Sequence, residues 1–169
     1  IGKPFIEMDP NRVVAILYSE EEDSCAVFTQ PDEVSRSIAR NILDFVRHEI
    51  NQERIPPLLP WQSGVGDVAN AVLNGFMEDD NYQERYIYSE VLQDAILDLI
   101  DIGKVRAASG SAMTLSHKAR ARFLNELYRY KEKIVLRPVE ISNSPEVIRR
   151  LGVIAIKFPG ARLHWDAQA

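Results

Sequence analysis

The sequence predicts an α/β fold, an open and mostly parallel sheet with helices on both faces. Strand-like and helix-like segments alternate along nearly the whole chain, which is typical of parallel strands joined by helices. A Gly-rich turn at residues 63–66 leads directly from a strand-like run into a helical one. With 169 residues, 46% of them hydrophobic, the chain can build one core of ordinary size, and no repeat, linker or low-complexity stretch divides it. We expect one folding unit that is an incomplete domain.

The first strand-like run comprises residues 12–18, which are apolar and β-branched and lie between Pro10-Asn11 and an acidic turn. We expect a buried strand there. Pro31-Asp32-Glu33 predicts the start of a helix that lasts to about Asn51, because proline and acidic residues suit the first turn of a helix. The apolar face of this helix is expected to comprise Val34, Ile38, Ile42, Phe45 and Val46.

A second strand is expected at residues 58–62, after the break made by Pro56 and Pro57. The helix at residues 67–77 follows the Gly-rich turn, and its Val68, Val72 and Phe76 are spaced for burial. The remaining segments continue the alternation, with strands at 86–88, 105–109, 134–139 and 153–156 and helices at 91–102, 118–130 and 145–151. Gly103 marks the end of the first of these three helices.

Two polar turns directly follow strands and predict a ligand site. In parallel sheets, ligands bind beyond the carboxyl ends of the strands, so the turn beginning at Ser63 and the turn Ser89-Glu90 are expected to come together there. The amides of Gly64, Val65 and Gly66 can hold an oxyanion or a phosphate at the start of the next helix. The turn lacks the third glycine of the dinucleotide fingerprint and the Gly-Lys-Ser/Thr of a P-loop, so an ordinary tight connection remains the alternative.

Three segments together carry a resemblance to a known family. They are residues 59–72 (Leu-Pro-Trp-Gln-Ser-Gly-Val-Gly-Asp-Val-Ala-Asn-Ala-Val), 89–94 (Ser-Glu-Val-Leu-Gln-Asp) and 142–154 (Ser-Asn-Ser-Pro-Glu-Val-Ile-Arg-Arg-Leu-Gly-Val-Ile). From about Phe5 to about Ile156 the sequence closely resembles the acetyl-CoA hydrolase/acetate CoA-transferase family of the class I CoA-transferase superfamily. The resemblance implies a CoA-transferase fold similar to that of NagB and RpiA.

The resemblance also implies a mechanism, in which Glu90 matches the nucleophilic glutamate of the family. That residue attacks the acyl-CoA carbonyl to give a mixed anhydride, and the CoA thiolate then converts the anhydride into a glutamyl-CoA thioester; a carboxylate side chain can form both species. One oxyanion donor comes from around Val65 in the Gly64–Gly66 turn, and its partner comes from a second Gly-rich turn that this chain lacks. Asn70 lies one helical turn further on and is a candidate to face the cleft, with a solvated or capping residue as the alternative.

By the same resemblance, the substrates are an acyl-CoA and a short carboxylic acid, namely acetate or else succinate or 4-hydroxybutyrate, with no permanently bound cofactor. Residues 1–157 correspond to part of a carboxyl-terminal catalytic domain, and residues 158–169 depart from the family pattern. The family implies an amino-terminal domain, a homodimer, and a cytoplasmic or, in a eukaryote, mitochondrial location. A non-catalytic α/β ligand-binding or interaction module, or an inactive fragment, is the alternative reading of the same residues.

Other polar residues near these motifs have structural explanations. Gln93 and Asp94 are expected to cap the helix that follows Glu90, or else to orient Glu90. Asn143 is expected to cap the helix that Pro145 opens. The pair Arg149-Arg150 is typical of a solvated helix face, with contact to CoA phosphates as the alternative.

Composition argues against several classes of function, although it leaves a local basic patch open. A net charge of −5 and a pI near 5.3 argue against binding of nucleic acid or an anionic membrane. No apolar run reaches the roughly 18 residues of a membrane span, and we expect no signal peptide. Cys25 is the single cysteine, which excludes an intrachain disulfide and favours a reducing compartment. The three histidines lack ligand spacing, so no metal is expected, and Ser63 does not lie in a Gly-x-Ser-x-Gly elbow, which disfavours a serine hydrolase.

Overall fold

The structure, a computed structural model, describes residues 8–21, 24–27, 30–56, 58–79 and 84–156. At its centre lies a five-stranded sheet in the order β6-β4-β2-β1-β7. Its strands are β1 (Trp61–Ser63), β2 (Arg85–Tyr88), β4 (Val105–Gly110), β6 (Ile134–Leu136) and β7 (Ile154–Ile156). Neighbouring strands in this sheet pair in parallel, which confirms the predicted sheet type. A second, two-stranded parallel sheet joins β3 (Val91–Leu92) to β5 (Ala112–Met113).

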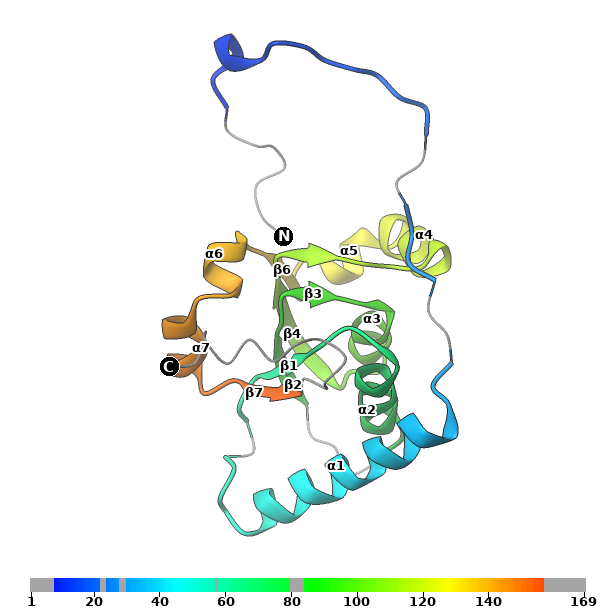
Figure 1. Ribbon diagram of the computed structural model, residues 1–169, viewed down its shortest axis with the longest axis vertical. Helices are drawn as coiled ribbons and strands as arrows, with labels where there is room; N and C mark the ends of the chain where they lie inside the picture. Colours follow the sequence, from blue (N-terminus) through cyan, green and yellow to red (C-terminus); the bar gives the residue numbers. More distant parts are fainter. Residues whose placement is uncertain (1–7, 22–23, 28–29, 57, 80–83, 157–169) are drawn as a thin grey trace.

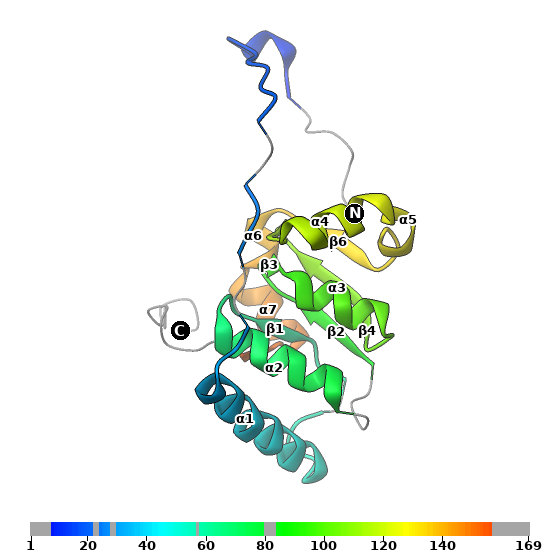
Figure 2. The ribbon, with the colours of Figure 1, turned by 90° about the vertical axis from the view of Figure 1, so that its right-hand side faces the viewer.

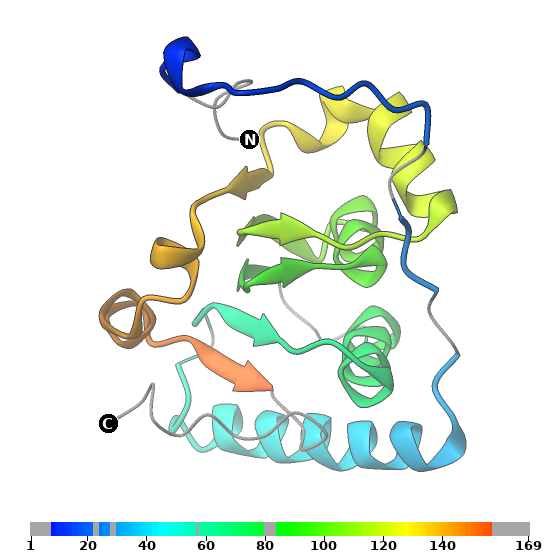
Figure 3. The same ribbon diagram turned by 45° about the horizontal axis from the view of Figure 1, so that its top comes forward.

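Helices lie on both faces of the larger sheet, as the sequence predicts (Figure 3). One face carries α2 (Asp67–Glu78) and α3 (Asp94–Asp101), and the other carries α6 (Val139–Ser142) and α7 (Pro145–Leu151). The long helix α1 (Glu33–Asn51) packs against α2 rather than on the sheet (Figure 1). On the far side of α3, α4 (His117–Asn125) is followed by α5 (Leu127–Tyr130) (Figure 2).

The main core lies between the sheet and the α2–α3 layer. The ring of Trp61 meets that of Phe76 edge-on, with 4.9 Å between centroids. Fully buried aliphatic side chains fill the rest of this layer, among them Val72, Leu73, Leu92, Ile96, Leu97, Leu99, Val105 and Ile134. Because β1, β2, α2 and α3 all contribute to this packing, the segments that follow β1 and β2 start from fixed positions.

A lysine holds the carboxyl end of α2. The Nζ atom of Lys104 donates to the carbonyl oxygens of Phe76, Met77 and Asp79, at 3.1, 2.8 and 2.9 Å. These carbonyls are among the groups that a helix end leaves without partners, and a cation there also complements the helix dipole. The contact therefore fixes α2 at the end opposite to the Gly-rich turn.

The predicted buried strand at residues 12–18 is wrong. A short 3₁₀ helix, η1 (Pro10–Arg12), is followed by extended chain without strand pairing. Val14 is 100% exposed and Leu17 is 94% exposed. The run has the composition of a strand, but no other described segment offers it a sheet edge or a packing surface, so composition alone does not bury it.

The predicted buried face of α1 is also wrong in part, because Val34 and Phe45 are exposed. The buried residues of this helix are Ser35, Ala39 and Val46. The helix packs closely on α2 at Gly75, where an added Cβ would collide with Leu43. The glycine of α2 therefore makes room for Leu43, and the covered face of α1 includes Ile42 and Leu43.

Several predicted boundaries shift. The helix predicted at 91–102 begins only at Asp94, because Val91 and Leu92 pair as β3. The helix predicted at 118–130 is divided at Glu126 into α4 and α5. The strand predicted at 134–139 ends at Leu136, since Pro138 precedes the short helix α6. The strand predicted at 58–62 occupies residues 61–63 instead.

Candidate active site

The turns after β1 and β2 meet at the carboxyl edge of the sheet, as predicted from their positions. The two strands are adjacent and parallel, with Trp61 opposite Ile87. The Oγ atom of Ser89 donates to the carbonyl oxygen of Ser63 at 2.9 Å. Ser89 is 1% exposed, so this hydrogen bond is buried and joins the two turns directly.

A second hydrogen bond joins the same two turns. Gln93 donates from Nε2 to the carbonyl oxygen of Gly64 at 3.0 Å, and the Ser63 hydroxyl donates to the same oxygen at 3.1 Å. The residues on either side of Glu90 thus hold two successive carbonyls of the Gly-rich turn. The sequence gives no direct signal of these roles beyond the presence of polar residues around Glu90.

The prediction that Gln93 and Asp94 cap α3 is wrong. Gln93 is at the N-cap position, but its side chain makes no capping hydrogen bond. The carboxylate of Asp94 instead accepts from the amide and the hydroxyl of Ser116, at 2.9 and 2.5 Å. Ser116 is itself the N-cap of α4, so Asp94 connects the starts of two helices and does not orient Glu90.

The Gly-rich turn presents main-chain donors. Gly66 has φ 134° and ψ 172°, a conformation that residues with a side chain rarely adopt, and an added Cβ would meet nothing within 4 Å. Val65 is 66% exposed, and its amide donates no hydrogen bond to any described residue. Gly66 is the N-cap of α2 and has no side chain that could cap the helix, which begins at the next residue. The positive end of the helix dipole therefore lies beside the Val65 amide. This arrangement suits a negatively charged oxygen.

Glu90 has a fixed main chain and an exposed side chain. Its carbonyl oxygen accepts from the amide and hydroxyl of Ser111, at 2.7 and 2.9 Å, and from the amide of Ala112 at 3.3 Å. A Cβ added at Gly110 would lie 3.2 Å from that carbonyl oxygen, so glycine leaves room for the turn. Within the described ranges, no hydrogen bond or ion pair engages the Glu90 carboxylate, and Glu90 is exposed.

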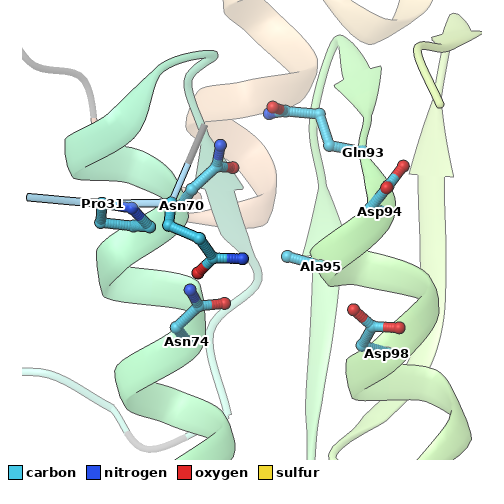
Figure 4. Close-up of a pocket in the computed structure, with 8 residues that line it drawn as sticks. Pro31, Asn70, Asn74, Gln93, Asp94, Ala95 and Asp98 are labelled. Carbon is cyan, nitrogen blue, oxygen red and sulfur yellow. The ribbon is translucent and has the colours of Figure 1, made fainter. Parts of the chain in front are cut away.

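Asn70 lines a hollow next to these turns. The hollow has a volume of about 160 Å³ and lies between α2 and α3. Asn70 and Asn74 line it from α2, and Ala95 and Asp98 face them from α3 (Figure 4). Glu90 and the Gly-rich turn are not among its lining residues, so the structure brings Asn70 near the two turns without placing it against Glu90.

Tyr88 anchors the end of β2, a role that the sequence did not indicate. Its hydroxyl donates to the carbonyl oxygen of Ile141 in α6 at 2.5 Å. Burial raises the pKa of Tyr88, against an opposite influence of the Arg137 charge. The residue before Ser89 is therefore held from the other face of the sheet.

The remaining predicted polar residues lie outside the two turns. The N-cap of α7 is Ser144, whose hydroxyl accepts from the Val147 amide at 3.4 Å, so the predicted cap at Asn143 is wrong by one residue. Arg150 approaches Glu146 at 3.9 Å with both side chains largely exposed, as expected for a solvated helix face. Among the described residues, no helix is long and apolar enough to cross a membrane, and no cluster of three acidic, histidine or cysteine side chains could hold a metal ion.

Curated relatives match nearly the whole chain. An acetyl-CoA hydrolase of Candida albicans is 41% identical over 160 residues, which are 94% of this chain and 30% of that protein. A succinyl-CoA:acetate CoA-transferase of Clostridium kluyveri is 40% identical over 157 residues, or 92% of this chain and 29% of that protein. A propanoyl-CoA:succinate CoA transferase of Escherichia coli is 38% identical over 157 residues, or 92% and 32%.

This chain belongs to the acetyl-CoA hydrolase/CoA-transferase family. It spans about 30% of the length of these relatives. No family model matches it.

Solved structures have the same fold as this family segment. A 4-hydroxybutyrate CoA-transferase of Porphyromonas gingivalis aligns with a TM-score of 0.60 at 17% identity, over 78% of this chain and 32% of that one. RipA of Yersinia pestis aligns with a TM-score of 0.56 at 21% identity, over 81% and 29%. At these identities the likeness concerns the fold, which is the open parallel α/β sheet predicted from the sequence.

Proposed function

We propose that the paired turns form part of the active site of an acyl-CoA:carboxylate CoA-transferase or acetyl-CoA hydrolase, with Glu90 as the nucleophile. The observation that carries this proposal is the buried hydrogen bond between Ser89 and the Ser63 carbonyl, at 2.9 Å. It brings a carboxylate and a turn with an unused amide to the same edge of the sheet. The names of the relatives supply the substrate class, an acyl-CoA and a short carboxylic acid such as acetate.

In the proposed reaction the ionised carboxylate of Glu90 attacks the acyl carbonyl, and the CoA thiolate leaves. The resulting mixed anhydride is attacked at the glutamyl carbonyl by that thiolate, which releases the acid and forms a glutamyl-CoA thioester. An incoming carboxylate attacks the thioester and regenerates acyl-CoA by the reverse steps. Water takes the place of this carboxylate in a hydrolase, so access of water to the activated acyl group decides between the two outcomes.

Each addition step creates an oxyanion that requires a donor already in place, and the loss of one such donor lowers the rate by on the order of a hundredfold or more. The amide of Val65, between Gly64 and Gly66, is the donor we assign. Exposure of Val65 and the lack of a described partner for its amide support this role. Asn70, which lines the neighbouring hollow, is a further substrate contact in this proposal.

The full activity belongs to a longer protein in this proposal, because the relatives are about three times as long as the matched segment. Residues 1–157 then form part of the domain that carries the catalytic glutamate, and an amino-terminal domain and a second subunit complete the enzyme. Residues 158–169, for which the sequence predicts a departure from the family pattern, lie outside the described residues.

The test is chemical trapping in the full-length gene product. Incubation with acetyl-CoA and then borohydride reduces a glutamyl thioester to an alcohol, and peptide mass spectrometry locates the change. We expect the mass loss in the peptide that contains Glu90, together with loss of both trapping and turnover in Glu90→Gln, because an amide is a poor nucleophile.

Glu84→Gln is the matched control, since Glu84 is an exposed glutamate next to the opposite end of β2. It should retain trapping at Glu90 and turnover. Turnover of acetyl-CoA that continues in Glu90→Gln, or a modified peptide elsewhere, contradicts the proposed nucleophile. Absence of both turnover and trapping in the unmodified protein favours a non-catalytic binding module instead.

A further inference from the structure

Gln93 holds the peptide group that contains the Val65 amide. We propose that Gln93 is a positioning residue, which aims the Val65 N–H at the oxyanion by holding the Gly64 carbonyl in the opposite direction. This inference rests on the proposed function, because it assigns the geometry of the donor used there. Gln93 lies three positions beyond Glu90, and in this proposal it acts through the Val65 peptide, although it also lines the hollow that Asn70 lines.

The peptide between Gly64 and Val65 is planar, which links the directions of its two polar groups. The Gly64 carbonyl and the Val65 N–H belong to one peptide unit, and the described chain contains no cis peptide bond. In a trans peptide the carbonyl and the N–H point in opposite directions, so a constraint on one also fixes the other. The 3.0 Å hydrogen bond from Gln93 draws the Gly64 oxygen toward the start of α3, and the Val65 N–H therefore points away from α3.

The turn needs such a constraint because glycine on both sides of Val65 leaves it many conformations. Ser63 also donates to the Gly64 oxygen, but it is the adjacent residue, at the end of β1, so its bond relates the turn only to its own strand. Gln93 acts from a different element, whose main chain is fixed at β3 and α3. It therefore relates the direction of the donor to the segment that carries Glu90.

The surroundings of Gln93 allow its positioning role to be tested without a large loss of stability. Gln93 is 1% exposed, and its Oε1 atom has no hydrogen-bond partner among the described residues. Replacement by leucine removes one hydrogen bond, but it also removes a buried acceptor without a partner. The Gly64 oxygen keeps the bond from Ser63, and Gly64 is only half-buried. The fold should therefore tolerate the change while the Val65 amide loses its fixed direction.

The experiment compares Gln93→Leu and Gln93→Met with the unmodified full-length gene product, with acetyl-CoA and acetate as substrates. We expect kcat to fall on the order of tenfold to hundredfold with KM for acetyl-CoA nearly unchanged, because the donor acts mainly on the transition state. Hydrogen exchange of the peptide covering residues 61–66 should accelerate. The thermal midpoint and circular dichroism spectrum should stay near those of the unmodified protein.

Gln62→Leu is the control, because Gln62 is also a buried glutamine but donates to neither turn carbonyl. It should keep the original kcat and exchange rate. Unchanged kcat in both Gln93 variants, with trapping at Glu90 intact, overturns the role of Gln93 and leaves the proposed function standing. The role of Gln93 is also overturned if kcat/KM falls only because KM rises, or if Gln62→Leu lowers kcat as much as the Gln93 variants do. Absence of turnover and trapping in the unmodified protein overturns both proposals.

Discussion

At the scale of single residues, the segment from Ser89 to Gln93 contains two side chains held by hydrogen bonds and, between them, the exposed side chain of Glu90. Ser89 and Gln93 are each 1% exposed and bond to main-chain carbonyls, whereas the Glu90 side chain is exposed. The main chain of Glu90 is held separately by Ser111 and Ala112. In the proposed reaction, a carboxylate on a fixed main chain loses less orientational freedom, which would favour its attack on a bound carbonyl.

Gly110 gives the first prediction at this scale. An added Cβ would lie 2.9 Å from the Leu92 Cγ and 3.2 Å from the Glu90 carbonyl oxygen. We expect Gly110→Ala to move the turn that carries Glu90 and to lower the free energy of unfolding by about 1–3 kcal/mol, as overpacking generally does. Denaturant unfolding measures the stability, and borohydride trapping measures the reactivity of Glu90. Wild-type stability together with undiminished trapping would show that this contact is not tight.

The candidate residues were only partly predictable from the sequence. The meeting of the Ser89-Glu90 turn with the Gly64–Gly66 turn could be predicted because polar or glycine residues directly follow apolar strands, and parallel strands end at one edge. The role of Glu90 as nucleophile comes from the family resemblance and stays a prediction. Ser89 and Gln93 bond to carbonyls that lie 26 and 29 residues earlier in the chain. A carbonyl has no residue-type signature, so these partners become visible only when the strands are placed side by side.

At the scale of elements, the errors arise where tertiary contacts overrule local pattern. The apolar pair Val91-Leu92 fits the start of a helix, but pairing with Ala112 and Met113 makes it a strand. In α1, packing against α2 at Gly75 places Leu43 on the covered face and leaves Phe45 exposed. In contrast, α7 spans the predicted residues 145–151, because a proline at its start and a left-handed glycine after its end fix both boundaries locally.

The N-cap of α1 gives a prediction about pH. The Oδ1 atom of Asp32 accepts from the Ser35 amide at 2.7 Å, and this hydrogen bond is the main reason why the pKa of Asp32 is lowered from its ordinary value of 3.8. The ionised cap therefore contributes its full stabilisation of the folded chain at pH values above 3.8. This contribution is lost as the pH falls through the lowered pKa of Asp32.

We expect the thermal midpoint to fall less steeply with acid in Asp32→Asn than in the unmodified chain, because asparagine can cap without titrating. Calorimetry at a series of pH values below 6 measures both curves. Parallel acid limbs would mean that protonation of other groups accounts for the whole acid response.

At the scale of the whole molecule, alternation of strands and helices was enough to predict a parallel sheet but not the order of its strands. The order β6-β4-β2-β1-β7 depends on where each connection crosses the sheet, and the helical segments carry little local information about this. The helices cover both faces of the sheet, as the alternation predicts: α2 and α3 lie on one face, and α6 and α7 lie on the other. The exposed segment at residues 13–18 lies apart from this body (Figure 1).

That segment gives a prediction about stability. Leu17 is 94% exposed, so Leu17→Ser should change the free energy of unfolding of the chain by no more than about 0.5 kcal/mol. Leu97→Ser, in the core at 0% exposure, should cost several kcal/mol, because it leaves a cavity and a buried hydroxyl. Urea unfolding of both variants checks this. A large effect of Leu17→Ser would place the segment against an apolar surface in solution.

The position of β1 between β2 and β7 also has a consequence for synthesis on the ribosome. The strand that leads into the Gly-rich turn pairs on one side with β2, which follows shortly in the chain, and on the other with residues 154–156. At roughly 5–20 residues per second, several seconds pass between translation of β1 and of β7. Throughout that interval the nascent chain exposes one unpaired edge of β1, to which a chaperone or a neighbouring nascent chain can bind before β7 emerges.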